Sequence, residues 1–184
     1  MSVPDTLTTE NAVLVLIDYQ ERLFPAMHDP DRLLNNVLKL VRGASVFGLP
    51  VIVTEQYPQG LGTTLPQIAE LLPGVAPLAK TCFSACDDEA FLKALRNTER
   101  TQVLLAGIET HICVYQTALA LVRGGWQVQV VTDACASRDP ANEVAALRRM
   151  EATGVAPTNV EMALFELLKV ARGEVFKQIS RIVK

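Results

Sequence analysis

The stretch "VLLAGIETHICVYQTALALVRGG", residues 103–125, combines two patterns of secondary structure. Its first part is a continuous apolar run, which is typical of a strand buried on both faces of a parallel sheet. After "IETHI" the apolar residues take helical spacing, and Gly124 and Gly125 are expected to end the helix. The stretch therefore predicts a strand that passes directly into a helix, with Cys113 in the first turn of that helix.

The remainder of the chain repeats this alternation. Apolar runs predict further strands at 11–20, 49–56, 77–85 and 126–136, and a short strand in "GVAPT" (154–158). Helical patterns lie between and after the strands, at 29–48, 84–97, 139–153, 159–171 and 173–184. This order indicates parallel βαβ units, so we predict an α/β fold: a three-layer α/β/α sandwich whose central sheet is mostly parallel, Rossmann-like and has about six strands. We see no linker or repeat and expect a single domain over 1–184.

Three helix starts carry capping signals. Asp29 and Asp139 each precede a proline, which suits the first helical position. In the helix at 84–97, Ser84 and Asp87 have the spacing of a capping box.

Composition and charge narrow the functional classes. Of the 184 residues, 49% are hydrophobic and the net charge is −3, so we expect a globular protein that does not bind nucleic acid, which normally needs a basic patch. The polar N-terminus "MSVPDTLTTE" lacks the features of a secretory signal, and no apolar stretch is long enough for a membrane span. We expect four free thiols and a cytoplasmic protein with no membrane association.

Polar residues follow four of the predicted strands. Asp18 ends the first strand, Gln56 the second, Lys80 lies in the third and Cys113 follows the fourth. Ligands of open parallel sheets bind at the carboxyl ends of the strands, so we expect these four side chains at one edge.

The position of Cys113 permits two interpretations. If Thr110 caps the helix, free backbone amides and the helix dipole would lower the pKa of the thiol, and a nearby lysine would lower it further. Alternatively, Cys113 is a small buried apolar residue, as most free cysteines are. The position alone does not decide between them.

Other residues near the expected edge are candidates for the pocket wall. Phe24, Tyr57 and Phe83 are placed to form an apolar wall, although core packing explains Phe83 equally well. We expect "GLGTT" (60–64) to be a flexible loop that borders the pocket. No G-x-G-x-x-G follows the first strand, and we expect no cofactor.

Four segments together resemble the isochorismatase-like hydrolase superfamily. "GIETHICVYQTALAL" resembles its cysteine motif, with matches at Gly107, Ile108, Thr110, Cys113, Val114, Thr117 and Ala118. "VLIDYQERLF" resembles the segment with the family's aspartate, and "LAKTCFSA" the segment with its lysine. "GWQVQVVTDACASR" resembles the fifth-strand segment, so the resemblance covers nearly the whole chain.

The resemblance implies specific roles. Cys113 would be the nucleophile, Asp18 would take its proton and later activate water, and Lys80 would hold the thiolate and orient Asp18. The family also implies a cis peptide bond between Ile108 and Glu109, which would direct the Glu109 amide, with that of Cys113, at the substrate oxygen. Members of the family form dimers, tetramers or larger assemblies, so we expect a homo-oligomer.

The sequence departs from the nicotinamidases of this superfamily, which hold a metal with histidines after the second strand. Here "TEQYPQGLGTTLPQI" contains no histidine, so we expect no metal site. The same region and "FSACDD" resemble a subgroup of isochorismatase-domain hydrolases with poorly defined substrates. The C-x₃-C pair Cys82 and Cys86 is read as two core cysteines rather than a zinc or redox site.

We therefore expect a metal-independent cysteine hydrolase that cleaves a C–N bond, of the amide or carbamoyl type, in a small molecule through a thioester. Two alternatives remain. One is hydrolysis of a vinyl ether, as in isochorismatase, with Asp18 as the acid. The other is a non-catalytic oligomer or a thiol redox sensor that uses Cys113, which would need a resolving cysteine nearby.

Overall fold

The computed structural model describes residues 6–184, so the first half of "MSVPDTLTTE" lies outside the described residues. Its centre is a sheet in which all neighbouring strands are parallel, with the order β3-β2-β1-β4-β5-β6. The strands are β1 (Ala12–Ile17), β2 (Val51–Gln56), β3 (Leu78–Lys80), β4 (Gln102–Ile108), β5 (Gln127–Ala136) and β6 (Ala156–Thr158). The predicted fold class is confirmed.

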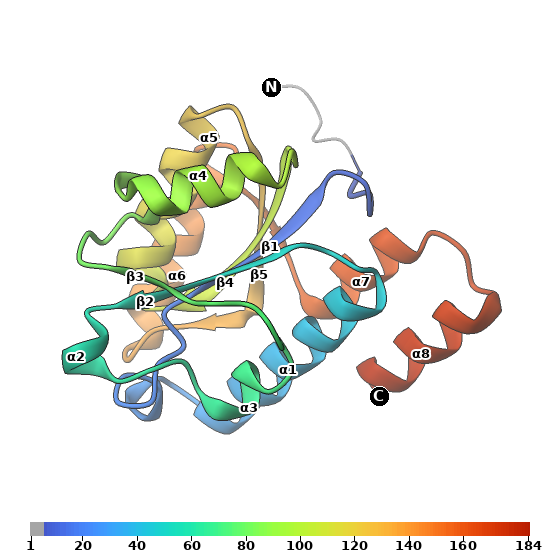
Figure 1. Ribbon diagram of the computed structural model, residues 1–184, viewed down its shortest axis with the longest axis horizontal. Helices are drawn as coiled ribbons and strands as arrows, with labels where there is room; N and C mark the ends of the chain where they lie inside the picture. The colour runs from blue at the N-terminus through green and yellow to red at the C-terminus, as the bar shows by residue number, and fades with distance from the viewer. Residues whose placement is uncertain (1–5) are drawn as a thin grey trace.

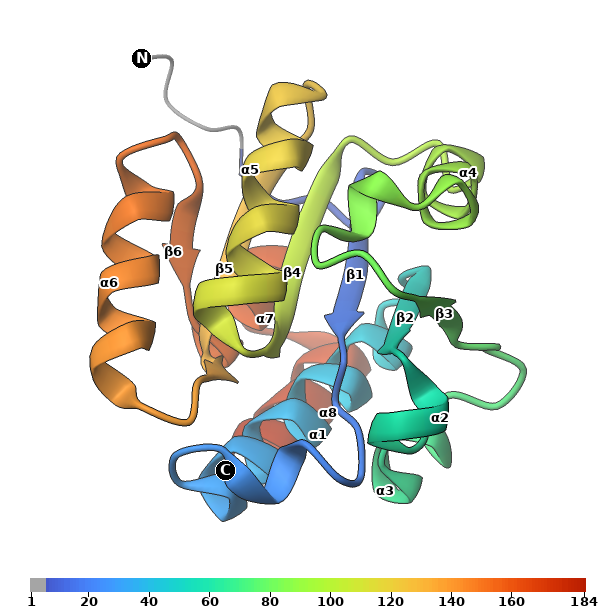
Figure 2. The ribbon, with the colours of Figure 1, turned by 90° about the vertical axis from the view of Figure 1, so that its left-hand side faces the viewer.

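Helices cover both faces of the sheet (Figures 1 and 2). One face carries α1 (Pro30–Val46), α7 (Val160–Leu168) and α8 (Gly173–Val183), and the other carries α4 (Glu89–Asn97), α5 (Tyr115–Arg123) and α6 (Pro140–Glu151). Successive residues of a strand point to opposite faces. In β1, Leu14 and Leu16 therefore pack in the first core, while Val13 and Val15 pack in the second. Both faces of the central strands β1 and β4 are buried, which explains why these two strands are almost entirely apolar.

Helix starts follow the capping signals with one exception. Asp29 accepts a hydrogen bond from the backbone N–H of Arg32, and Asp139 accepts one from Ala141. The predicted capping box at Ser84 is wrong, because α4 begins later and its cap is Asp88, whose carboxylate accepts from the N–H of Phe91 at 3.0 Å. The residues before it form a 3₁₀ turn, η2 (Ala85–Asp87).

Short helices occur in segments for which the sequence predicted no helix. The segment after β2 contains α2 (Pro58–Leu61) and α3 (Pro66–Ala69), and η1 (Phe24–Ala26) follows β1. Each has a proline at its start, where the missing N–H has no intrahelical partner to lose. They are too short to produce a hydrophobic periodicity. Among residues 6–184, no helix has the length and apolar character that crossing a bilayer requires.

The strand-to-helix junction is unusually tight. After β4 the chain forms one π-helical turn, η3 (Thr110–Val114), and then enters α5. A Cβ atom on Gly107 would lie 2.5 Å from Cβ of Ile17 and 2.9 Å from Cγ2 of Val114, so only glycine lets β4 and the turn approach β1 this closely. Thr110 does not cap the helix as expected, and its buried hydroxyl has no hydrogen-bond partner.

Candidate active site

The order of the strands places two of the predicted residues side by side. The chain proceeds from β1 to β2 on one side and reaches β4 on the other, so the direction of winding reverses between β1 and β4. Crevices at such reversals, beyond the carboxyl ends of the strands, are the usual ligand sites of open α/β sheets. Asp18 directly follows β1, and Cys113 lies in the turn after β4.

Lys80 completes this group from two strands away. It is the last residue of β3, and its long side chain passes the end of β2 to reach β1. Its Nζ donates to Oδ2 of Asp18 at 2.7 Å, to Oε1 of Gln56 at 2.7 Å and to the carbonyl of Cys82 at 3.3 Å. The Lys80 and Asp18 side chains are each 1% exposed, so this is a fully buried ion pair. The structure thus brings together the four side chains predicted to converge.

The Asp18 carboxylate is held from both sides. Thr54 Oγ1 donates to Oδ1 at 2.7 Å, while the ammonium of Lys80 occupies Oδ2. The backbone of Asp18 has φ of 60°, a left-handed conformation that aspartate tolerates better than most residues. Strained backbone of this kind gathers at functional sites.

Burial and two neighbouring charged groups, the Asp18 carboxylate and the Lys80 ammonium, determine the pKa of the Cys113 thiol. Burial raises the pKa of the Cys113 thiol to about 12, and the adjacent Asp18 carboxylate contributes to the increase. The ammonium of Lys80 lowers the pKa, but by less. The interpretation with a lowered pKa is therefore wrong: desolvation of the thiolate outweighs the attraction of the lysine. At neutral pH Cys113 is a thiol beside a carboxylate.

A small cavity opens onto this group. Its volume is about 250 Å³, and it is lined by Asp18, Leu23, Gln56, Leu61, Phe83, Glu109, Ile112, Cys113 and Arg138. Gln56, predicted for the polar edge, and Phe83, predicted for the apolar wall, both line it. "GLGTT" borders it as expected, through Leu61.

Two predicted wall residues lie elsewhere. Phe24 is 5% exposed and packs in the core, where its ring centroid lies 6.2 Å from that of Tyr19. Tyr57 is 55% exposed and does not line the cavity, because its left-handed backbone turns the ring against Gly60. The apolar lining residues on these two segments are Leu23, which was not predicted from the sequence, and Leu61, which belongs to the predicted 60–64 segment.

The residue before the cysteine turn differs from expectation. The Ile108–Glu109 peptide bond is not cis, and no peptide bond within the described residues is. The chain turns instead at Glu109, which has a left-handed backbone with φ of 44° and ψ of 71°.

The Glu109 side chain belongs to a polar group beside the cavity. The Glu109 carboxylate accepts a hydrogen bond from Nε of Arg138, and its other oxygen lies 3.3 Å from Nδ1 of His111. The same Nδ1 lies 3.0 Å from Oγ of Ser137. These contacts tie the turn after β4 to the segment after β5. The sequence did not predict that the side chains of Glu109 and Arg138 would contact each other beside the cavity, because the two residues follow different strands.

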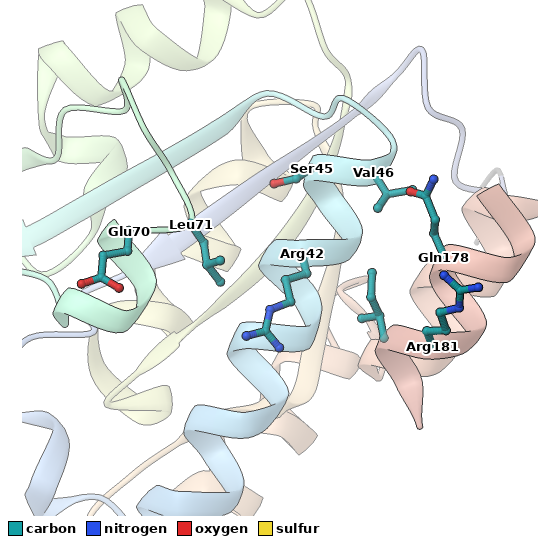
Figure 3. Close-up of a pocket in the computed structure, with 8 residues that line it drawn as sticks. Arg42, Ser45, Val46, Glu70, Leu71, Gln178 and Arg181 are labelled. Carbon is teal, nitrogen blue, oxygen red and sulfur yellow. The ribbon is translucent and has the colours of Figure 1, made fainter. Parts of the chain in front are cut away.

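Among the residues that the structure describes, the remaining thiols and carboxylates form no metal cluster. Cys82 and Cys86 are half-buried and, like Cys113 and Cys135, are free thiols. Within residues 6–184, no three His, Cys, Asp or Glu side chains gather closely enough to hold a metal ion. A larger groove of about 530 Å³ lies away from the site, where α1 passes between α3 and α8 (Figure 3). Arg42 and Arg181 extend over its apolar floor, and none of the candidate catalytic residues reaches it.

Comparisons with known proteins agree with this arrangement. The family model described as "Isochorismatase domain" matches residues 12–162. Isochorismatase domain-containing protein 2A of Mus musculus is 37% identical over 176 residues, which are 95% of this chain and 84% of that protein.

Two solved structures are also similar. YcaC from Pseudomonas aeruginosa, determined with hexane-2,5-diol and covalent acrylamide, has a TM-score of 0.94 and 31% identity, and the match covers 100% of this chain and 92% of that one. The YcaC gene product of Escherichia coli, described as an octameric hydrolase of unknown specificity, has a TM-score of 0.93 and 29% identity over 99% of this chain and 91% of that one. The chain belongs to the isochorismatase-like hydrolase family, in the subgroup of isochorismatase domain-containing proteins.

Proposed function

We propose that this protein is a metal-independent cysteine hydrolase that cleaves a C–N bond, of the amide or carbamoyl type, in a small molecule. One observation carries the proposal: Asp18, which forms a buried ion pair with Lys80, and the thiol of Cys113 line the same small cavity. A structural ion pair has no need of a thiol beside it, whereas a nucleophile needs an adjacent base and a group that orients this base.

The first step would form a thioester. As Sγ of Cys113 attacks the carbonyl carbon, its proton passes to the carboxylate of Asp18. The tetrahedral intermediate then expels the nitrogen, which takes that proton and leaves as ammonia or an amine. The ammonium of Lys80 keeps the Asp18 carboxylate in place and offsets the negative charge that develops on the sulfur.

The second step would release the acid. Asp18 takes a proton from a water molecule while the water oxygen attacks the thioester carbon. The C–S bond then breaks, the sulfur regains its proton, and the carboxylic acid leaves. One carboxylate thus acts as base in both steps, which requires that its position be fixed. The hydrogen bonds from Thr54 and Lys80 to its two oxygens fix it.

The oxyanion of each intermediate would be bound by the backbone amides of Glu109 and Cys113. Both residues line the cavity, and the left-handed backbone of Glu109 sets the direction of the turn that presents them. Preorganised amides of this kind often contribute a large part of the rate enhancement.

The similar structures support this proposal in two ways. The Pseudomonas YcaC structure contains covalent acrylamide, and we propose that Cys113 of the present chain is likewise accessible to a small electrophile. The Escherichia coli YcaC protein is described as an octameric hydrolase. We therefore also propose that the chain acts as a homo-oligomer on a small-molecule substrate.

Mass spectrometry of the intact protein tests the proposal. Wild type, Cys113→Ala and Cys82→Ala would be incubated with a panel of small amides, ureas and vinyl ethers, and quenched in acid. We expect acyl adducts on wild type and on Cys82→Ala, whose replaced thiol lies outside the cavity lining, and none on Cys113→Ala. Turnover should persist after exhaustive chelation.

Each other outcome identifies a different function. Turnover of a vinyl ether that survives Cys113→Ala would replace C–N cleavage by acid catalysis at Asp18. A disulfide between Cys113 and a second cysteine under mild oxidant, without any adduct or turnover, would favour a redox sensor. Loss of turnover on chelation, with rescue by zinc, would contradict metal independence.

A further inference from the structure

The cavity is lined by both polar and apolar side chains. Asp18, Gln56, Glu109, Cys113 and Arg138 carry its polar or reactive groups, while the four apolar lining residues, which form its apolar wall, come from four different segments: Leu23, Leu61, Phe83 and Ile112. An apolar wall in the same cavity as a reacting thiol is complementary to an aliphatic group attached to the carbonyl that the thiol attacks. The apolar wall is therefore expected to select the non-reacting part of the substrate.

Leu61 belongs to a segment that is pinned rather than flexible. It ends α2, which lies beyond the carboxyl end of β2 (Figure 2). The backbone N–H of Arg22 donates to the carbonyl of Leu61 at 3.1 Å, and Nη1 of Arg22 donates to the carbonyl of Gly60 at 2.9 Å. Gln20 Nε2 donates to the carbonyl of Gly62 at 2.7 Å. The expectation of a flexible loop at 60–64 is not met.

A buried carboxylate fixes the far end of the same segment. Glu55 is 8% exposed, and its Oε1 accepts from both the backbone N–H of Thr64 at 2.6 Å and the hydroxyl of Thr64 at 2.8 Å. Thr64 also pairs with Gln20 through a β-bridge. Bonds at both ends keep Leu61 from moving aside when a longer ligand enters, so this side chain acts as a rigid stop.

We propose that Leu61 is a specificity-determining residue and that the substrates are compact carboxamides with a short aliphatic acyl chain. The inference rests on the proposed function, because it assumes that Cys113 takes up the acyl group. The cavity volume of about 250 Å³ fits this class, since it lies below the range of pockets that hold drug-sized ligands. The pinned segment makes Leu61, rather than the exposed ring of Phe83, the limit on chain length.

The substitution Leu61→Ala tests this directly. Each methylene group that becomes buried strengthens binding about fourfold, until the chain meets the wall. Alanine removes three carbon atoms, so the preferred chain should lengthen by about two to three carbons. Leu61→Phe should shorten it. Leu65→Ala is the matched control, because Leu65 follows the same segment but packs on the core and does not line the cavity.

Straight-chain aldehydes from ethanal to octanal serve as probes. The thiol of Cys113 adds to the aldehyde carbon, the C=O double bond becomes a C–O single bond, and the thiol proton ends on that oxygen, which gives a hemithioacetal. Calorimetry measures the affinity along the series without requiring turnover, and Cys113→Ala shows how much of the binding depends on the thiol. The kcat/KM values for the matching primary amides provide the second readout.

The outcomes separate the two proposals. We expect an optimum chain length in wild type and Leu65→Ala, a longer optimum in Leu61→Ala and a shorter one in Leu61→Phe. The same optimum in all four proteins would overturn the role of Leu61 and leave the cysteine mechanism standing. Aldehyde affinities that do not change in Cys113→Ala would overturn the cysteine mechanism itself.

Discussion

At the scale of single residues, the site depends on a thiol that is protonated at rest. Burial and the Asp18 carboxylate raise the pKa of Cys113, and Lys80 only partly opposes them. A buried thiol is less exposed to oxidation and alkylation than a free thiolate. Transfer of its proton to Asp18 would then occur as the substrate carbon is attacked, so activation of the nucleophile would be tied to substrate binding.

The pH dependence of alkylation tests this description. For substrate-free protein, the rate at which iodoacetamide modifies Cys113 should rise about tenfold per pH unit from pH 7 to 10, because the thiolate fraction rises tenfold per unit below the pKa. Peptide mass spectrometry resolves the four cysteines and measures each rate. A plateau for Cys113 below pH 9 would show a preformed thiolate and contradict the raised pKa.

The buried ion pair should show strong coupling. Lys80→Met or Asp18→Asn alone leaves a buried group without its partner and should lower the free energy of unfolding by about 3–5 kcal/mol. The double variant should lose much less than the sum, as urea denaturation of the four proteins would reveal. The exposed pair Lys177 and Glu174 is the control, with an expected coupling below about 1 kcal/mol. Additive losses at Asp18 and Lys80 would contradict a direct pair.

At the scale of elements, the site is built where strands end and helices begin. β4 passes through one π-helical turn into α5, and π-helical turns are rare features that concentrate at functional sites. Gly107 allows this turn to lie against Ile17 of β1. Similarly, η2 follows the lysine segment and delays the start of α4 until Asp88.

The start of α4 offers a test at this scale. Asp88→Ala removes the side-chain acceptor for the N–H of Phe91 and should lower the free energy of unfolding by about 1 kcal/mol. Ser84→Ala should have no such cost, because the Ser84 side chain caps no helix. Thermal unfolding of both variants makes the comparison. A larger decrease in stability for Ser84→Ala than for Asp88→Ala would show that Ser84 caps the helix after all.

At the scale of the whole molecule, the sheet order decides which residues meet. Asp18 and Cys113 are 95 positions apart in the printed sequence, yet β1 and β4 are neighbours. On the sheet face that carries α1, the C-terminal helices α7 and α8 leave large apolar side chains exposed, among them Met162 and Phe165 on α7. Exposed apolar side chains that gather on one element mark interaction surfaces.

Assembly is the prediction that belongs to this scale. Sedimentation velocity should give a mass that is a multiple of the chain mass, in line with the octameric YcaC neighbour. We propose that the subunit contact lies on α7. Phe165→Glu should then lower that mass by placing a charge in the contact, whereas Val144→Glu, an equally drastic change on α6, should not. Sedimentation of wild type as single chains at micromolar concentration would contradict the proposed homo-oligomer.

Several features were determined by the sequence alone, because their physical causes are local. Continuous apolar strands alternating with amphipathic helices defined the parallel sheet, and Asp29 and Asp139 defined two helix starts. The ends of the strands also marked Asp18, Gln56, Lys80 and Cys113 for the same edge, since parallel strands end together.

Only the tertiary structure decided how those residues behave. The pKa of Cys113 is raised because segments distant in the sequence bury its thiol. The position of Cys113 at the start of a helix does not reveal this burial. Phe24 and Tyr57 lie outside the cavity because backbone turns after β1 and β2 direct their rings elsewhere, and Leu23 and Leu61 form the wall instead. Sequence position shows that a residue is near the edge of the sheet, but the direction of its side chain depends on dihedral angles and contacts that form only when the chain is folded.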